Sequence, residues 1–267
     1  MRIAIDHRSQ YRFSKPQARI VQLLRVTPCD TEYQTVVNWR IDVDVDARLR
    51  RGVDGYGNIV TMLYAEGPIE SLEVTVTGEV LTTEATGVVR GGAEPLPPML
   101  FLRSTPRTLA SVSLAEFAEA APADSPLGRL HALNAALHAR FPCTPDTTDT
   151  GITAAEAFTA SRATSRDVAQ MMVAAARHLH IPARYVSGYR SDGEAHGAPH
   201  AWAEAHIDDL GWVGFDPATG LSPDASYVRV AVGLDATAAA SIAGTRIGQG
   251  EEALDVDLHV DEIGSQD

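Results

Sequence analysis

Length, composition and charge limit what this chain can be. It has 267 residues, of which 45% are hydrophobic and 21% are charged, and its formal net charge is −13. A chain of this length can bury one large core or two modest ones. The acidic excess disfavours nucleic acid or an anionic membrane as the main partner. No apolar run approaches the roughly 20 residues that span a bilayer, and the first residues lack the apolar stretch of a secretory signal, so we expect a cytoplasmic location.

The first ninety residues carry the pattern of short β-strands. Apolar and polar residues alternate partly over 36–45 and more cleanly over 72–80, as in half-buried strands. Turn signals at Asp54-Gly55 and Gly67-Pro68 separate the runs. Several short strands at this spacing predict an antiparallel β-sandwich over residues 1–90.

A stretch rich in glycine and proline, residues 91–98, follows this β region. Its composition is typical of a linker and predicts a boundary between the sandwich and a second domain over residues 91–267. Two helices are predicted at the start of that domain. One opens with Ser113 and Glu116, the spacing of a capping box, and the other opens with Ser125-Pro126, a cap residue followed by proline at the first helical position.

A third predicted helix begins near Thr164. Its apolar residues Val168, Met172, Ala175 and Leu179 fall on one helical face, and Pro182 ends it. Strands are then predicted over 183–189, 201–207 and 212–215, with strand-like pieces in the tail at 228–232 and 254–260 around a flexible Ala/Gly-rich middle. A helix followed by an antiparallel sheet predicts an α+β fold.

Four segments of this region carry the chemistry. They read T-S-R-D-V-A from Thr164, I-P-A-R-Y-V-S-G-Y from Ile181, H-A-W from His200 and G-W-V-G-F-D-P from Gly211. Together they resemble the core of the transglutaminase-like superfamily, whose Cys-His-Asp layout is papain-like. The L-R-V-T-P motif around Leu24 and D-G-Y-G-N from Asp54 resemble the N-terminal β region that precedes bacterial members of this family.

The resemblance implies a catalytic triad with one substitution. His200 falls at the position of the general base, and Asp216 at that of the residue that orients it. At the nucleophile position the family pattern reads roughly G-V-C-x-D, whereas this chain has A-T-S-R-D from Ala163, so Ser165 replaces the cysteine. A helix start would help to ionise a thiol, but a serine hydroxyl needs a base that removes its proton during attack.

Three interpretations of Ser165 stay open at this point. Serine and threonine are preferred helix N-caps, so Thr164 or Ser165 could simply cap the helix. Ser165 could also act as a nucleophile itself, or it could be an engineered replacement for cysteine that silences an enzyme. Ala163 and Thr164 also differ from the family's Gly-Val, and this favours a natural serine over a single engineered change.

The remaining candidate residues are weaker. Cys29 lies in the β region and Cys143 lies between two prolines off the motif, so neither is expected to be the nucleophile. His196, His200 and His206 cluster with acidic residues such as Glu194, but glycine and proline between the first two histidines rule out the helical face of an H-E-x-x-H zinc site. We therefore expect no metal and no cofactor.

The resemblance implies acyl chemistry on amide bonds of a peptide or protein substrate, by hydrolysis in many bacterial members and by transfer to an amine in others. With Ser165 as written, such an enzyme is expected to be inactive or weak. The alternative is a pseudoenzyme that keeps the cleft as a peptide-binding module. The sequence leaves homo-oligomerisation open.

Overall fold

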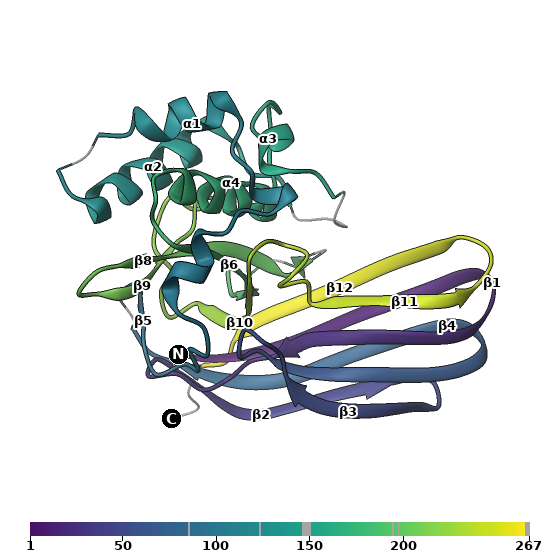
Figure 1. Ribbon diagram of the computed structural model, residues 1–267. Helices are drawn as coiled ribbons and strands as arrows, with labels where there is room; N and C mark the ends of the chain where they lie inside the picture. The colour runs from purple at the N-terminus through teal and green to yellow at the C-terminus, as the bar shows by residue number, and fades with distance from the viewer. Residues whose placement is uncertain (85, 123, 146–150, 194, 197, 265–267) are drawn as a thin grey trace.

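The computed structural model describes residues 1–84, 86–122, 124–145, 151–193, 195–196 and 198–264. Three layers follow one another in space (Figure 1): a group of helices, a five-stranded sheet and a sandwich of long strands. The molecule is α+β, as predicted, and every strand pairing within its two sheets is antiparallel. Among the described residues, none of the helices combines the length and apolar character that crossing a bilayer requires.

The sandwich is one sheet bent back on itself. Its strands are β1 (Arg2–Thr27), β2 (Gln34–Val43), β3 (Ala47–Val53), β4 (Ile59–Thr82), β7 (Ala195–His196), β11 (Ile242–Gly248) and β12 (Glu252–Glu262). The long strands β1 and β4 pair along most of their lengths, with a break in register between Arg12 and Gln17. At that point the strands turn back, on the right in Figure 1. Gly67 is needed there, because a Cβ atom on it would lie 2.0 Å from the carbonyl oxygen of Gln17.

Each half of the bent strands has its own neighbours. The first half of β1 pairs with β12 and the second half with β11. The first half of β4 pairs with β3 and the second half with β2. The alternating burial along β1 and β4 points residues such as Leu24, Leu63 and Leu72 inward, where they form an apolar core between the two layers. The predicted β-sandwich is therefore present.

The predicted domain boundary needs correction. β11 and β12 come from the end of the chain, yet they complete the sandwich by pairing with β1, so residues 91–267 do not form a separate domain. The reason is that β1 has two long edges, and the first ninety residues supply a partner for only one of them. The stretch 91–98 is not a free linker either, because Glu94 forms an ion pair with buried Arg184 of the second sheet.

The second sheet carries the segments that resemble a catalytic core. Its strand order is β10 (Tyr227–Gly233), β6 (Ala183–Arg190), β8 (His200–Ile207), β9 (Gly211–Phe215) and β5 (Val88–Val89). The strands predicted over 183–189, 201–207, 212–215 and 228–232 are all found. One face of this sheet packs on the sandwich through an apolar cluster that includes Ile3 and Ile5 of β1 with Val228 and Val230 of β10.

The helices cover the other face of the second sheet. They are α1 (Val112–Glu119), α2 (Pro126–Arg140), α3 (Ala154–Ala157) and α4 (Ser165–His178), preceded by two 3-10 turns, η1 (Pro98–Leu102) and η2 (Pro106–Thr108). In α4 the predicted face of Val168, Met172 and Ala175 is buried against the sheet. Helix α1 begins earlier than predicted, because Ser111 rather than Ser113 accepts a backbone hydrogen bond as its cap.

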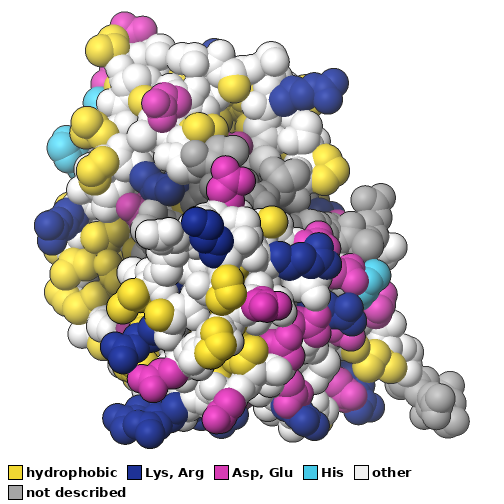
Figure 2. All heavy atoms as spheres, turned by 90° about the vertical axis from the view of Figure 1, so that its right-hand side faces the viewer, with side chains coloured by type: hydrophobic (Ala, Val, Ile, Leu, Met, Phe, Trp, Pro, Cys, Tyr) yellow, Lys and Arg dark blue, Asp and Glu magenta, His cyan; other side chains and the backbone are white. Residues whose placement is uncertain are grey.

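Figure 2 views the end of the molecule at which the sandwich strands turn back. Side chains of Lys and Arg are interspersed there with those of Asp and Glu. The described side chains on this face therefore carry charges of both signs.

Candidate active site

The start of α4 is held by a threonine cap. The Thr164 side chain accepts a hydrogen bond from the Asp167 backbone N–H at 3.3 Å, and the Asp167 carboxylate accepts one from the Thr164 N–H at 2.9 Å. This reciprocal pair is a capping box. Of the two candidate caps, Thr164 performs the role, and Ser165 is the first residue inside the helix. The capping interpretation of Ser165 is therefore wrong.

Ser165 faces the strand that carries the candidate base. Its Oγ accepts a hydrogen bond from the backbone N–H of Ala201 at 3.1 Å, and its side chain is buried. Because backbone and side-chain bonds are about 1.3–1.5 Å long, the Cα atoms of Ser165 and His200 are no more than about 8 Å apart. A separation of this size is compatible with a side-chain contact between the two residues.

His200 and Asp216 form a short polar pair between the start of β8 and the end of β9. Nε2 of His200 lies 2.8 Å from Oδ2 of Asp216. A carboxylate only accepts, so the imidazole proton belongs on Nε2 and Nδ1 is the nitrogen that can take a proton. The His200 side chain is half-buried and Asp216 is fully buried, so solvent reaches this pair from the histidine side.

Asp216 stays a carboxylate despite its burial. Burial by itself would raise its pKa, but the charge and hydrogen bond of His200, with hydrogen bonds from the Tyr227 hydroxyl and the Ala218 N–H, hold that pKa below its ordinary value. The Tyr227 hydroxyl donates to Oδ2 at 2.6 Å and the Ala218 N–H to Oδ1 at 2.9 Å. Burial, and then the neighbouring Asp216 charge, raise the pKa of Tyr227, so this phenol remains a donor.

Aromatic rings fix the position of the His200 ring. Trp202 stacks on it with ring centroids 6.3 Å apart, and Tyr227 meets it edge-on at 5.7 Å. Gly188 pairs with His200 across β6 and β8. A Cβ atom on Gly188 would lie 2.6 Å from the Trp202 ring, so glycine at this position leaves room for the stack. Sequence reasoning quoted the segment that holds Gly188 without giving that residue a role, and it did not single out Tyr227.

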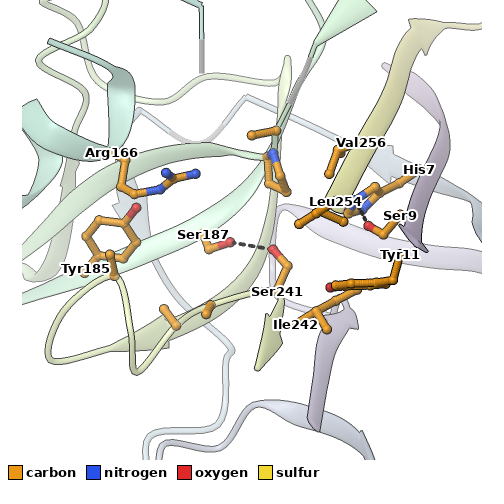
Figure 3. Close-up of a pocket in the computed structure, with 15 residues that line it drawn as sticks. His7, Ser9, Tyr11, Arg166, Tyr185, Ser187, Ser241, Ile242, Leu254 and Val256 are labelled. Atoms are coloured by element: carbon orange, nitrogen blue, oxygen red, sulfur yellow. Dashed lines mark hydrogen bonds between the residues drawn. The ribbon is translucent and has the colours of Figure 1, made fainter. Parts of the chain in front are cut away.

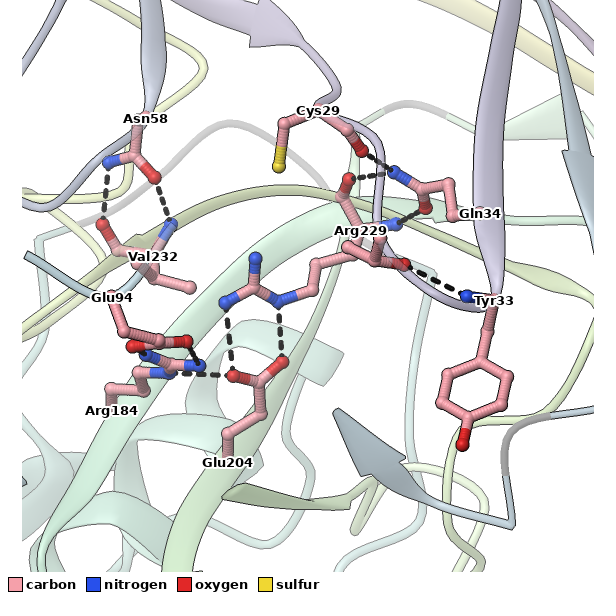
Figure 4. A network of polar contacts seen from close by, with 10 residues as sticks. Cys29, Tyr33, Gln34, Asn58, Glu94, Arg184, Glu204, Arg229 and Val232 are labelled. Atoms are coloured by element: carbon pink, nitrogen blue, oxygen red, sulfur yellow. Dashed lines mark hydrogen bonds and ion pairs between the residues drawn. The ribbon is translucent and has the colours of Figure 1, made fainter. Parts of the chain in front are cut away.

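A buried ion cluster lies farther along β8 (Figure 4). Glu204 is fully buried and accepts hydrogen bonds from Arg184 at 2.6 Å and from Arg229 at 2.7 Å. Burial would raise the pKa of Glu204, but the two guanidinium groups lower it to about 2. Arg229 also exchanges backbone hydrogen bonds with the side chain of Gln34. The cluster therefore joins the second sheet to the sandwich, and sequence reasoning did not find it.

The other candidate residues lie outside the triad. Cys143 is exposed but forms a parallel backbone bridge with Ala163, so it is nearer to the start of α4 than the sequence indicated. Cys29 is half-buried at the contact between the sandwich and the second sheet. Within the described part of the chain, no three His, Cys, Asp or Glu residues are grouped closely enough to hold a metal ion. Glu194 lies outside the described residues.

A hydroxyl at a helix start, close to a His–Asp pair on neighbouring antiparallel strands, defines the papain/transglutaminase-like class of α+β proteins. The comparisons with known proteins agree with that assignment. The family model of the transglutaminase-like superfamily matches residues 115–217, and that of the bacterial transglutaminase-like N-terminal region matches residues 3–81. The chain therefore carries a core of the transglutaminase-like superfamily together with the bacterial transglutaminase-like N-terminal region.

Two known proteins are similar to this chain over nearly all of its length. An uncharacterized protein from Mycobacterium leprae is 26% identical over 280 residues, which cover 97% of this chain and 98% of that protein. A crystal structure from Cytophaga hutchinsonii, named "Putative Cysteine Protease", has a TM-score of 0.78 at 20% identity and covers 100% of this chain and 92% of its own. This likeness shows the shared fold. The periplasmic domain of TgpA from Pseudomonas aeruginosa, with a TM-score of 0.35 at 16% identity, covers 79% of this chain and 87% of its own.

Proposed function

We propose that this protein performs acyl chemistry on an amide bond of a peptide or protein, with Ser165 in the place of a cysteine nucleophile and weak activity as a consequence. The observation that carries the proposal is the convergence of three residues from separate elements: Ser165 at the start of α4, His200 at the start of β8 and Asp216 after β9.

Each residue has a chemical role in this proposal. His200 Nδ1 takes the hydroxyl proton while Ser165 Oγ attacks the carbonyl carbon, and Asp216 stabilises the imidazolium that forms. In this proposal the positive end of the α4 dipole stabilises the oxyanion that develops. The imidazolium then protonates the leaving amine, and water or a second amine releases the acyl group from Ser165. Entry of water gives hydrolysis, and entry of an amine gives acyl transfer.

The alternative function is a pseudoenzyme that uses the same cleft to bind a peptide. One observation favours it: Ser165 Oγ already accepts a hydrogen bond from the Ala201 N–H. This bond draws electron density from the oxygen and makes it a poorer nucleophile. A thiolate would gain from the same N–H, because that donor stabilises negative charge, so the surroundings of position 165 suit sulfur better than oxygen.

The first test of the proposal uses the protein as it is. A fluorophosphonate probe reacts with activated serine hydroxyls, and we expect slow labelling at Ser165 that the Ser165→Ala and His200→Ala variants abolish. Labelled peptides identified by mass spectrometry give the site. No labelling of Ser165 above that of a surface serine would favour the pseudoenzyme.

The second test restores the sulfur. In Ser165→Cys we expect iodoacetamide to react at position 165 with a pKa below the ordinary value of about 8.5, faster than at Cys29 or Cys143, together with turnover of peptide or glutamine–amine substrates. Peptide mapping separates the three thiols. An ordinary pKa without turnover would contradict an enzyme site and leave a binding cleft.

A further inference from the structure

A pocket of about 180 Å³ lies between the sandwich and the second sheet, directly beside the candidate triad. Arg166, which follows Ser165, and Pro199, which precedes His200, both line it. In Figure 3 the Arg166 and Tyr185 side chains lie on one side of the pocket, and residues of β1 and β12 lie on the other. The pocket therefore lies next to residues that flank Ser165 and His200 in the chain.

The sandwich side of this pocket is uncharged. His7 and Ser9 of β1 line it, and both are buried. Burial lowers the pKa of His7 to about 4, so the ring is neutral at physiological pH. Its Nδ1 is 3.0 Å from the Tyr189 hydroxyl, and its Nε2 is 3.2 Å from Ser9 Oγ. Both ring nitrogens are thus engaged with hydroxyl groups, and none of the described residues that line this side of the pocket is a carboxylate.

The opposite side is built from small residues and hydroxyl groups. Ser187 of β6 and Ser241 lie with their Oγ atoms 3.4 Å apart, and Ala236, Ala239 and Ala240 supply short apolar side chains. Among the described residues that line the pocket, Arg166 is the one with a permanent charge, and that charge is positive. A positive charge placed among these apolar and hydroxyl side chains would lose part of its hydration, and no described residue of the lining offers a carboxylate in return.

We propose that this pocket is the subsite for the side chain next to the scissile carbonyl of the acyl donor, and that it accepts an uncharged side chain of medium size and excludes a basic one. The inference rests on the proposed function, since it needs an acyl donor at position 165. The volume of the pocket fits a side chain of medium size, because a cavity of about 150 Å³ is large enough for benzene. The proposed subsite also gives the sandwich a role in substrate binding, because β1 and β12 form one wall of the subsite.

The test separates the chemistry of position 165 from the selectivity of the pocket. Ser165→Cys is combined with Cys29→Ser and Cys143→Ser, so that a single thiol remains. Rates of alkylation are measured with iodoacetamide, which does not need the pocket, and with two peptidyl chloromethyl ketones that end in norleucine or lysine. These two side chains have the same four-carbon chain and differ in the terminal ammonium group. We expect the norleucine reagent to react at least about tenfold faster than the lysine reagent.

Two substitutions then address the pocket directly. Ala240→Leu fills it and should lower the norleucine rate about tenfold or more, while Thr237→Leu, on the same turn but exposed and outside the pocket, should not. Ser241→Asp places an anion in the wall and should raise the lysine rate relative to the norleucine rate. The iodoacetamide rate should stay unchanged in all three variants, and this shows that they are folded.

The outcomes distinguish the two proposals. A thiol with an ordinary pKa and equal, slow rates for all reagents would overturn the proposed function. A reactive thiol that does not discriminate between the two ketones, or whose discrimination is unaffected by Ala240→Leu and Ser241→Asp, would leave that function intact and overturn the subsite.

Discussion

Asp216 and Glu204 are two fully buried carboxylates of the same sheet, and their surroundings differ. Asp216 is held by one imidazole, one phenol and one backbone N–H, and 13% of the side chain of its histidine partner is exposed to solvent. Glu204 is held by two guanidinium groups whose charge is permanent. A carboxylate paired with a titratable group can take part in proton transfer, whereas one paired with arginines is a fixed charge that links segments. Burial and a lowered pKa alone do not identify a catalytic carboxylate.

The substitution with the largest expected effect is Glu204→Gln, which tests whether Glu204, unlike Asp216, serves mainly to stabilise the fold. Glu204→Gln removes the charge that both Arg184 and Arg229 contact, so Arg229 loses the carboxylate it pairs with while Arg184 keeps only Glu94. We expect the free energy of unfolding to fall by about 3–5 kcal/mol, the usual cost of breaking a buried ion pair, measured by urea denaturation. The matched control is Glu79→Gln, whose partner Arg2 is exposed, and it should cost less than about 1 kcal/mol. Equal effects of the two substitutions would contradict the structural role of Glu204.

Acid should weaken the protein through the same carboxylate. The pKa of Glu204 is about 2 in the folded state against an ordinary value of 4.5, so its contribution is fully present above pH 4.5 and is lost as the pH falls toward 2. The contribution is at most about 3 kcal/mol. Unfolding free energies measured between pH 5 and pH 2.5 should fall more steeply for the natural protein than for Glu204→Gln. Parallel slopes would show that other groups dominate acid unfolding.

The Asp216→Asn substitution should change the pKa of the thiol at position 165 more than it changes stability, the reverse of what we expect for Glu204→Gln. The amide keeps the shape of the carboxylate, so we expect a stability loss of about 1–3 kcal/mol, as for one buried hydrogen bond made imperfect. In the Ser165→Cys background, however, the thiol pKa should rise toward its ordinary value, because the imidazolium loses its counter-charge. Glu204→Gln in that background should leave the thiol pKa unchanged. If both substitutions shift it equally, the distinction between the two carboxylates is wrong.

The smallest expected effect concerns the helix caps. Thr164→Ala and Ser111→Ala each remove an N-cap and should each cost about 1 kcal/mol. In the Ser165→Cys background Thr164→Ala should also slow iodoacetamide labelling at position 165, because it loosens the turn that positions the thiol. Ser111 caps α1, away from the site, and serves as the control. Equal labelling rates would show that the first turn of α4 is positioned without its cap.

Local patterns were sufficient to predict much of this fold. The strands after Pro182, the cap at Ser125 and the apolar face of α4 each depend on a few neighbouring residues, and the structure has them. The segments that hold Ser165, His200 and Asp216 were recognised by their motifs, and the structure brings them together.

Pairing between distant segments could not be predicted in the same way. Strand β11 reads I-A-G-T-R-I-G, which is short, glycine-rich and half-polar, so it resembles a flexible loop until its pairing with β1 is known. The sequence around the ion cluster gives no local signal for it. Strand pairing alone brings together Glu204, Arg184 and Arg229. The choice between Thr164 and Ser165 as the cap depends on backbone geometry, because both side chains are suitable.

The pairing of β1 with β11 and β12 also has a consequence for biosynthesis. β1 leaves the ribosome long before these partners exist, and the whole helical region and second sheet are made in between. Domains generally fold as units while the chain is made, but here one edge of β1 stays uncovered until β11 and β12 have been made. Such an exposed edge is a site where nascent chains can associate wrongly, and this exposure ends only when β11 and β12 pair with β1. A ribosome-bound chain that stops before β11 should therefore be recognised by chaperones.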